Sequence, residues 1–151
     1  MISQGQLFQY AQNQALAAVF LKAQSPAPAN TYLGLSMTAI GALDEHEVSM
    51  AGVTINEYPS GSGYARQLYN PTSPTNASPS QVWNTNVITW GPFTSGPGTC
   101  FWALCCDAVT GPSAHTIAAF LLGTSRTPAA GDSITGAAGT GVAGVGFIFQ
   151  I

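Results

Sequence analysis

The sequence predicts a mainly β protein, a β-sandwich of jelly-roll type with one N-terminal α-helix. Short segments of alternating or continuous apolar residues recur along the chain, and turns rich in Gly and Pro separate them. Helical periodicity is confined to the first fifth of the chain, so nothing between the strands offers the helical crossovers of a parallel sheet. We therefore expect a helix or arm over residues 1–24, a Pro-rich linker over 25–30 and a β-sandwich domain over 31–151.

The N-terminal helix is predicted by a start signal and by the helical spacing of its apolar residues. Ser3 can cap the helix and Gln6 follows three residues later, which is the pattern of a capping box, and Ile2 can contact Leu7. The opposite face carries Gln and Asn without charge. We expect the helix to end near Ala23.

Two interpretations of this helix are open. It can lie on the sheet of its own domain, or it can act as an arm that docks on another subunit. A face of Gln and Asn can lie against another protein without burying an unpaired charge. The candidate docking residues are Leu7, Phe8, Ala11, Ala15, Val19 and Phe20.

The strand segments follow the linker. Alternation of apolar and polar residues predicts strands over residues 32–37, 52–58, 63–69 and 82–90. Residues 59–62 have the composition of a hairpin turn between the second and third of these. The continuous apolar runs 100–106 and 117–122 are typical of strands covered on both faces. Residues 145–151 alternate to the last position and should form a central strand, whereas 70–80, with three Pro, should be an exposed loop or arm.

The low charge of the chain limits its partners. Only 6% of the residues are charged, against roughly 25% in an ordinary soluble domain. Three basic residues are too few to cluster on nucleic-acid phosphates or on anionic lipids. Either the surface is solvated by uncharged polar residues, or neighbouring subunits cover most of it.

The N-terminal segment and the cysteines both point to a cytoplasmic site of synthesis. Residues 1–14 contain five Gln and no basic residue, unlike a secretory signal, and no window has the length of a bilayer span. The three cysteines are an odd number and lie close together. Adjacent Cys105 and Cys106 would point to opposite faces of a strand, so we expect buried free thiols.

The sequence offers no arrangement for catalysis. It lacks a nucleophile motif and the ending of a phosphate-binding loop in its Gly-rich stretch 136–146. No nucleophile motif is available to His46 or His115, and the carboxylates Glu57, Asp107 and Asp132 are isolated from one another. We therefore expect a protein that is not an enzyme and carries no catalytic or cofactor-binding residues.

One acidic cluster, Asp44-Glu45-His46-Glu47, is the candidate for a metal site. It lacks the length and the Gly spacing of a calcium-binding loop. We expect a solvated turn here and no bound metal.

A structural pair of Glu57 and Arg66 is predicted in the middle of the chain. Arg66 lies inside a predicted strand of a chain with few cations, and an isolated buried guanidinium is costly. Glu57, on the other side of the predicted turn, is the nearest candidate partner. A structural role is favoured over ligand binding.

Several motifs resemble small virion structural proteins of tailed bacteriophages, the head-decoration (cement) and tail proteins. The motifs are Tyr32-Leu33-Gly34-Leu35, Glu57 ahead of Gly63-Tyr64-Ala65-Arg66, the segment 84–90, Cys106-Asp107-Ala108 with Gly111, and Gly131-Asp132-Ser133-Ile134. The resemblance covers residues 32–151. It implies a virion component, assembled in the host cytoplasm, that forms a homo-oligomer such as a trimer.

Within this resemblance the leading expectation is a capsid decoration protein that stabilises the head shell by contacting the major capsid protein. The first alternative is a tail adaptor or fibre-base component that contacts other tail subunits. The second is a module that binds a host glycan, since jelly rolls often bind sugars. Sugar binding would need exposed aromatic residues, and Trp83, Trp90 and Trp102 all lie in apolar strand segments where burial is expected.

Overall fold

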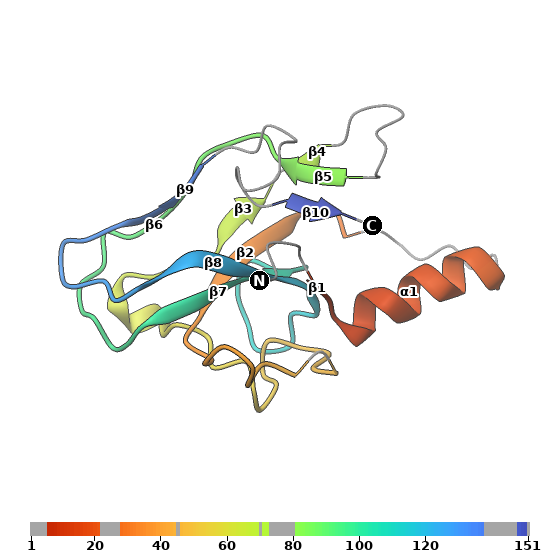
Figure 1. Ribbon diagram of the computed structural model, residues 1–151, viewed down its shortest axis with the longest axis horizontal. Helices are drawn as coiled ribbons and strands as arrows, with labels where there is room; N and C mark the ends of the chain where they lie inside the picture. Colours follow the sequence, from red (N-terminus) through yellow and green to blue (C-terminus); the bar gives the residue numbers. More distant parts are fainter. Residues whose placement is uncertain are drawn as a thin grey trace.

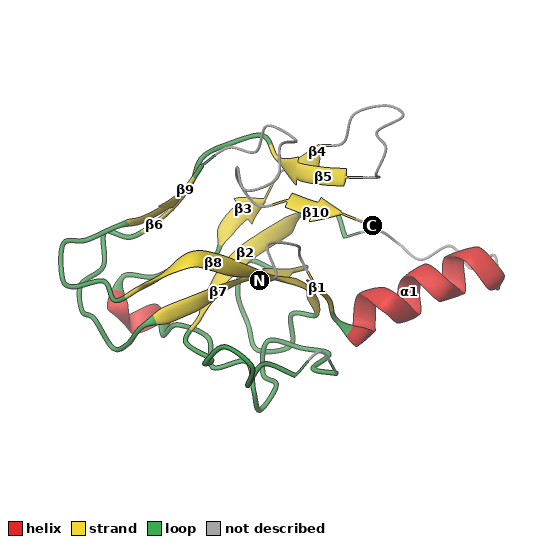
Figure 2. Ribbon diagram, viewed as in Figure 1, coloured by secondary structure: helices red, strands yellow, loops and turns green. Residues whose placement is uncertain are grey.

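A five-stranded antiparallel sheet forms the centre of the molecule (Figures 1 and 2). The computed structural model describes residues 6–21, 28–44, 46–69, 71–72, 81–137 and 148–150. In spatial order the sheet consists of β1 (Gln6–Leu7), β8 (Thr116–Arg126), β7 (Cys100–Cys106), β2 (Thr31–Ser36) and β3 (Gln67–Tyr69). The predicted strands at 32–37, 100–106 and 117–122 are confirmed as β2, β7 and β8.

Two smaller antiparallel sheets accompany it. One has the order β10 (Ile148–Gln150), β5 (Gln81–Asn84) and β4 (Pro71–Thr72), and the other pairs β6 (Ile88–Trp90) with β9 (Ile134–Gly136). The described part of the chain has one α-helix, α1 (Gln9–Phe20), and one short 3₁₀ helix, η1 (Ser60–Ser62). The mainly β class with one N-terminal α-helix is confirmed, and the jelly-roll order stays a prediction.

The central sheet carries a hydrophobic core on each face. Side chains alternate in direction along a strand, and adjacent Cys105 and Cys106 accordingly belong to different buried clusters. The Cys105 side contains Trp90 and Ile134 of the β6–β9 pair, and the Cys106 side contains Phe8, which precedes α1. The expectation that the run 100–106 is covered on both faces is confirmed.

The predicted strand over 82–90 is wrong as a single element. It divides into β5 and β6, which belong to different sheets. The fully buried Asn84 causes the break, because its side-chain amide donates to the Asn86 carbonyl at 2.6 Å and to the Ala137 carbonyl at 2.8 Å. A side chain that bonds its own backbone two residues on favours a turn over a continuing strand.

The predicted hairpin over 52–69 is also wrong, although the end of its predicted second strand, 63–69, is confirmed as β3, which pairs with β2. Residues 52–56 are turns, in which the Ile55 N–H donates to the Gly52 carbonyl and Asn56 has a positive φ of 37°. Position 57 joins β2 only by an isolated bridge to Ser36. The left-handed conformation of Asn56 interrupts the extended backbone, so the alternation in the sequence does not produce a strand.

The C-terminal strand was expected to be central, and this is wrong. In the described residues β10 pairs with β5 alone and lies at the edge of its sheet. Much of the predicted loop 70–80, the linker residues 25–27 and most of the Gly-rich stretch lie outside the described residues, although β4 pairs Pro71 with Asn84. None of the described helices is long and apolar enough to cross a membrane.

Candidate functional site

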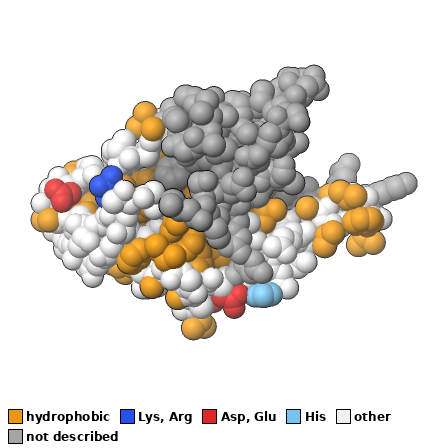
Figure 3. Space-filling model, viewed as in Figure 1, with side chains coloured by type: hydrophobic (Ala, Val, Ile, Leu, Met, Phe, Trp, Pro, Cys, Tyr) orange, Lys and Arg blue, Asp and Glu red, His pale blue; other side chains and the backbone are white. Residues whose placement is uncertain are grey.

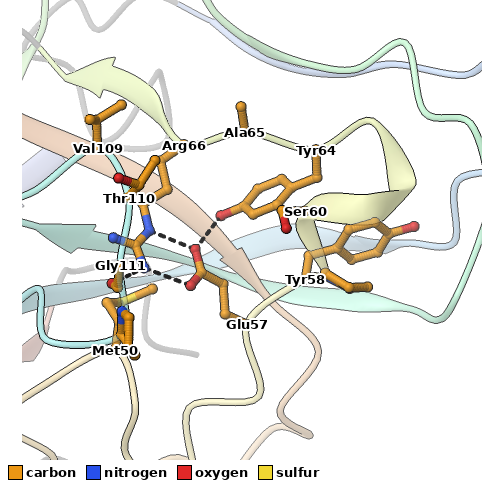
Figure 4. Close-up of a pocket in the computed structure, with 12 residues that line it drawn as sticks. Met50, Glu57, Tyr58, Ser60, Tyr64, Ala65, Arg66, Val109, Thr110 and Gly111 are labelled. Atoms are coloured by element: carbon orange, nitrogen blue, oxygen red, sulfur yellow. Dashed lines mark hydrogen bonds and ion pairs between the residues drawn. The ribbon is translucent and has the colours of Figure 1, made fainter.

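Glu57 and Arg66 form an ion pair with two hydrogen bonds between their side chains (Figure 4). Arg66 Nε donates to Glu57 Oε1 at 2.7 Å and Nη2 donates to Oε2 at 2.7 Å. The guanidinium is buried and also donates to two backbone carbonyls, Nη1 to Ala108 at 2.9 Å and Nη2 to Gly111 at 3.0 Å. The hydrogen bonds to Glu57 raise the pKa of Arg66. The structure therefore places these two predicted residues together and uses Arg66 to hold the loop that follows β7.

Tyr64 completes this network. Its hydroxyl donates to Glu57 Oε1 at 2.8 Å and accepts the backbone N–H of Leu35 at 2.9 Å. β3 pairs only with residues 31–33 of β2 and therefore does not reach Leu35. The Tyr64 hydroxyl accepts the Leu35 N–H in place of a strand carbonyl. Burial of the side chain raises the pKa of Tyr64, and the negative charge of the neighbouring Glu57 carboxylate raises it further. Its hydroxyl is a neutral structural donor.

A pocket of about 570 Å³ lies beside the network. Its lining is largely apolar, and Glu57 and Arg66, its two charged residues, neutralise each other. The other residues of the wall are Met50, Tyr58, Pro59, Ser60, Tyr64, Ala65, Val109, Thr110, Gly111 and Pro112. Such a pocket can accept an uncharged apolar group, and its size is within the range of ordinary binding pockets.

The start of the N-terminal helix differs from the prediction. Gln6 and Leu7 form a strand that pairs with β8, and α1 begins only at Gln9 with Phe8 at its N-cap and no capping side chain. The capping-box interpretation is therefore wrong for Gln6, while Ile2 and Ser3 lie outside the described residues. Pairing with β8 satisfies the backbone of residues 6–7, so an earlier helical turn is not formed.

The base of α1 is fixed to the β-domain. Phe8 is 2% exposed in the core, and its N–H donates to the Ile117 carbonyl at 3.0 Å. The Tyr10 ring stacks on the His115 ring, with the centroids 4.2 Å apart and the planes 7° apart. His115 Nδ1 lies 2.6 Å from Asp107 Oδ2, and Asp107 Oδ1 accepts the His115 N–H at 2.7 Å. These contacts set the direction in which α1 leaves the domain.

The second half of α1 is exposed to solvent. Leu16, Val19 and Phe20 are 56%, 70% and 75% exposed, and Leu21 at the C-cap is 77% exposed. Ala11 is half-buried and Ala15 is exposed. Figure 1 shows the helix projecting away from the sheets, and Figure 3 shows apolar side chains gathered at its far end. The expected end near Ala23 is wrong, because the helix ends at Phe20.

The expected division of α1 into a polar and an apolar face is wrong as well. The polar residues Gln9, Gln12, Asn13 and Gln14 all lie in the first half, and the residues from position 15 to 21 are all apolar. Polarity therefore changes along the helix axis and not around it. Of the six candidate docking residues, Leu7 and Phe8 belong to the β-domain and Ala15, Val19 and Phe20 face solvent.

Three further carboxylates have local hydrogen-bond roles. Asp44 accepts from the N–H of His46 at 2.9 Å, Glu47 accepts from the N–H of Thr54 at 2.8 Å, and Asp132 accepts from the N–H of Ala129 at 2.8 Å. Across the described ranges, which omit Glu45, no three His, Cys, Asp or Glu side chains are grouped as a metal site would need. These contacts stabilise turns.

The three cysteines are free and buried, as predicted. Burial raises the pKa of the Cys106 thiol from 9.0 to about 11 and that of Cys100 from 9.0 to about 12. The thiols therefore stay protonated and unreactive near neutral pH. They act as small packing groups.

Two of the three tryptophans that could have formed a sugar-binding platform are buried. Trp90 is fully buried and its Nε1 donates to the Leu33 carbonyl at 3.0 Å. Trp102 is buried on the other face of the central sheet, in the Cys106 cluster. The side chain of Trp83 lies outside the described part of the structure. Neither described indole presents a face to solvent.

Tyr64, Gly34 and Tyr10 were not predicted as site residues, although Tyr64 and Gly34 lie in the motifs that carry the resemblance to phage proteins. Gly34 gives the Tyr64 hydroxyl room to reach Leu35, and a Gly inside a strand signals such a close approach. Tyr10 was placed in the helix without a role, and no signal in the sequence connects it with His115, which is more than a hundred residues away.

A comparison with known protein families relates the chain to a family of phage proteins. Residues 6–142 match the family described as Podophage GP4 fiber I protein gp80. None of the curated proteins compared with the chain is significantly similar to it. The family match covers most of the chain and confirms the resemblance to virion structural proteins of tailed phages. The chain therefore belongs to the family of the podophage GP4 fiber I protein gp80 and is a structural protein of a tailed-bacteriophage virion.

Proposed function

We propose that this protein is a non-enzymatic subunit of the tail-fibre apparatus and that it attaches to other virion proteins through the second half of α1. The exposure of Leu16, Val19, Phe20 and Leu21 carries the proposal. An isolated helix of this length is marginal in water, and α1 lacks a capping side chain, acidic residues in its first turn and basic residues in its last. Packing against a partner would supply the missing stabilisation.

The contacts at the base of α1 support the same proposal. A helix that is fixed at Phe8 and Tyr10 presents its far end in a defined direction, which reduces the entropy lost when a partner binds. Residues 15–21 are apolar and uncharged, so an interface formed by these side chains alone would bury no unpaired charge, and Lys22 follows them in the sequence.

The fibre name of the family favours a tail location over the capsid decoration that the sequence first suggested. Self-association, as a trimer or another homo-oligomer, and contacts with tail subunits are part of the proposal.

The proposal is tested by assembling virions with altered protein. Replacing Val19 and Phe20 together by Gln should leave the domain folded and remove the protein from purified virions. Asn13→Ala, a change on the exposed polar half of the same helix, is the matched control and should leave incorporation unchanged. Cryo-electron microscopy of the virion should place the protein at the tail fibres. Density on the head shell, or normal incorporation of the Gln variant, would contradict the proposal.

A further inference from the structure

A groove of about 550 Å³ lies at the foot of α1. Three segments that are far apart in the sequence line it: Tyr10 of α1, residues 28–30 with Tyr32 at the start of β2, and residues 107–109 after β7. The groove shares only Val109 with the pocket beside the Glu57–Arg66 pair. The exposed tip of α1 is not part of it, so the groove is a separate surface from the one proposed for attachment.

The walls of the groove are held in place by the fold. Tyr32 lies in the interior of the central sheet, where β2 is paired with both β3 and β7. The Tyr10 ring is stacked on the His115 ring, and His115 Nδ1 in turn lies 2.6 Å from Asp107 Oδ2. A preformed site loses less conformational entropy when it binds a ligand.

Several polar groups of the groove are not used by the fold. Asn30 is exposed, and Tyr10 and Tyr32 are partly exposed. Within the described ranges, the carboxamide of Asn30 and the hydroxyls of Tyr10 and Tyr32 form no hydrogen bond to another residue. Asp107 is hydrogen-bonded to His115 through both oxygens, but each carboxylate oxygen has two lone pairs and keeps one for a ligand. The groove thus offers donors and acceptors beside two aromatic rings.

The charge of the groove selects a neutral ligand. Asp107 is the one charged residue among those that line it. A carboxylate accepts hydrogen bonds from hydroxyl groups and repels a second carboxylate or a phosphate. An uncharged ligand that carries many hydroxyl groups therefore fits the groove better than an anionic one.

The ligand also needs an apolar surface, because two tyrosine rings and the Val109 side chain, which is 48% exposed, line the groove. A saccharide has both properties, since the C–H groups of its ring form an apolar face and its hydroxyls lie around the edge. A peptide that binds by strand addition needs a free sheet edge, and β2 is already paired on both sides at Tyr32. The groove therefore favours a saccharide over an extended peptide.

Going beyond the attachment role, we propose that this groove binds a neutral saccharide. The sugar ring packs on the aromatic surface of Tyr10 and Tyr32, and its hydroxyls donate to Asp107 and accept from the carboxamide of Asn30. The volume of the groove is within the range of sites for small ligands. The platform for the sugar is then formed by tyrosines, and not by the buried Trp90 and Trp102.

Binding is measured with the full-length protein on an array of neutral and anionic oligosaccharides. The neutral set is built from glucose, galactose, mannose, rhamnose and N-acetylglucosamine, and the anionic set carries uronic acids, sialic acids or phosphate. We expect binding to members of the neutral set only. A titration followed by NMR with the neutral oligosaccharide that binds best then gives its affinity in solution.

Two substitutions that should leave the fold intact locate the site. Asn30→Ala removes an exposed carboxamide and Tyr32→Phe removes only a hydroxyl, and neither group is hydrogen-bonded to another described residue. Each substitution should weaken binding of that oligosaccharide about fivefold, the effect of one lost hydrogen bond, and leave the urea midpoint unchanged. Ser125→Ala, which alters an exposed polar residue near the far end of β8, is the matched control and should bind as the wild type does.

Three results would overturn the proposal. They are no binding to any neutral oligosaccharide, equal or stronger binding to the anionic set, and wild-type affinity in both Asn30→Ala and Tyr32→Phe. A proline-rich peptide is titrated alongside, and its binding in place of a saccharide would also overturn the proposal, because the tyrosines would then recognise a protein. None of these results bears on attachment, which the Val19 and Phe20 double substitution tests by incorporation into virions, and Asn30→Ala should be incorporated normally.

Discussion

Gly34 of β2 lies against the Tyr64 hydroxyl, and a Cβ atom at position 34 would be 2.6 Å from that oxygen. The same Cβ would be 3.1 Å from Glu57 Oε1. The absence of a side chain at one position of a buried strand thus makes room for the network that joins Tyr64, Glu57 and Arg66 to the sheet. Gly34 is part of a motif by which the chain resembles phage structural proteins. The close approach of the Tyr64 hydroxyl is a physical reason for a glycine at this position.

Gly34→Ala should therefore destabilise the protein. The added methyl group displaces the Tyr64 hydroxyl from Leu35 and Glu57, and overpacking of a tight core typically costs about 1–3 kcal/mol. Urea denaturation measures the loss. Gly123→Ala is the control, because Gly123 lies in β8 with no atom near its hypothetical Cβ. Equal stability of the two variants would show that position 34 has room to adjust.

Arg66→Ala should cost about 3–5 kcal/mol, because it leaves the Glu57 carboxylate beside the core without its partner and the Ala108 and Gly111 carbonyls without a donor. Arg126→Ala, on the exposed end of β8, should change the free energy of unfolding by less than about 0.5 kcal/mol. A double-mutant cycle with Glu57→Ala isolates the pair. A coupling energy near zero would mean that Arg66 acts through the backbone carbonyls alone.

Alkaline pH should destabilise the fold through the buried thiols. Burial favours the neutral thiol, so the folded state of Cys106 keeps its proton to a pKa of about 11, against 9.0 ordinarily. The contribution of the protonated thiol to the free energy of unfolding is fully present well below pH 9. It is lost as the pH rises from about 9 towards 11, by up to about 1.4 kcal/mol per pH unit for each thiol. The buried Tyr64 acts in the same direction. The urea concentration at the unfolding midpoint should therefore decrease from pH 7.5 to pH 9 and decrease further at pH 10.5.

The matched variant for this pH dependence is Cys106→Ala. It should be less stable than the wild type at pH 7.5, because packing is lost, but its stability should fall less steeply towards pH 10.5. A wild-type stability that is constant from pH 7.5 to 10.5 would contradict the burial of the thiols.

The sequence predicts the strands whose signal is local and strong. The run 100–106 coincides with β7 because seven apolar residues need cover on both faces, whatever the rest of the chain does. Alternation failed where one residue overrides it, as Asn84 does by bonding to Asn86 and Ala137, and Asn56 does by its positive φ. The strand β9 was not predicted, because three residues are too few to show the alternation of apolar and polar side chains that marks a strand.

The site could be predicted only in part for a similar reason. Arg66 is conspicuous because the chain has so few cations, and Glu57 is close in sequence. The contact of Tyr10 with His115 depends on the pairing of β1 with β8, which places the start of α1 beside the residue that precedes β8. A strand of two residues leaves no pattern in the sequence from which this pairing could be predicted. The same short strand explains why the predicted capping box is wrong, because Gln6 is paired with β8 and is not in the first turn of a helix.

Phe8 and Phe20 were predicted to share one docking face, and the structure assigns them opposite roles. Phe8 is 2% exposed within the core cluster that contains Leu104, whereas Phe20 is 75% exposed at the far end of α1. Phe8→Ala should therefore destabilise the purified protein by about 3–5 kcal/mol, the usual cost of removing a buried aromatic ring.

Phe20→Ala, the same chemical change twelve positions later, should alter the free energy of unfolding of the dilute protein by less than about 0.5 kcal/mol, since the ring contributes little to its own domain. At high concentration it should weaken self-association, because the partner surface loses the ring. Urea denaturation at low concentration and sedimentation over a dilution series separate the two effects. A large loss of stability in dilute Phe20→Ala would mean that the helix tip packs on its own domain in solution, and a small loss in Phe8→Ala would mean that the base of α1 is not fixed.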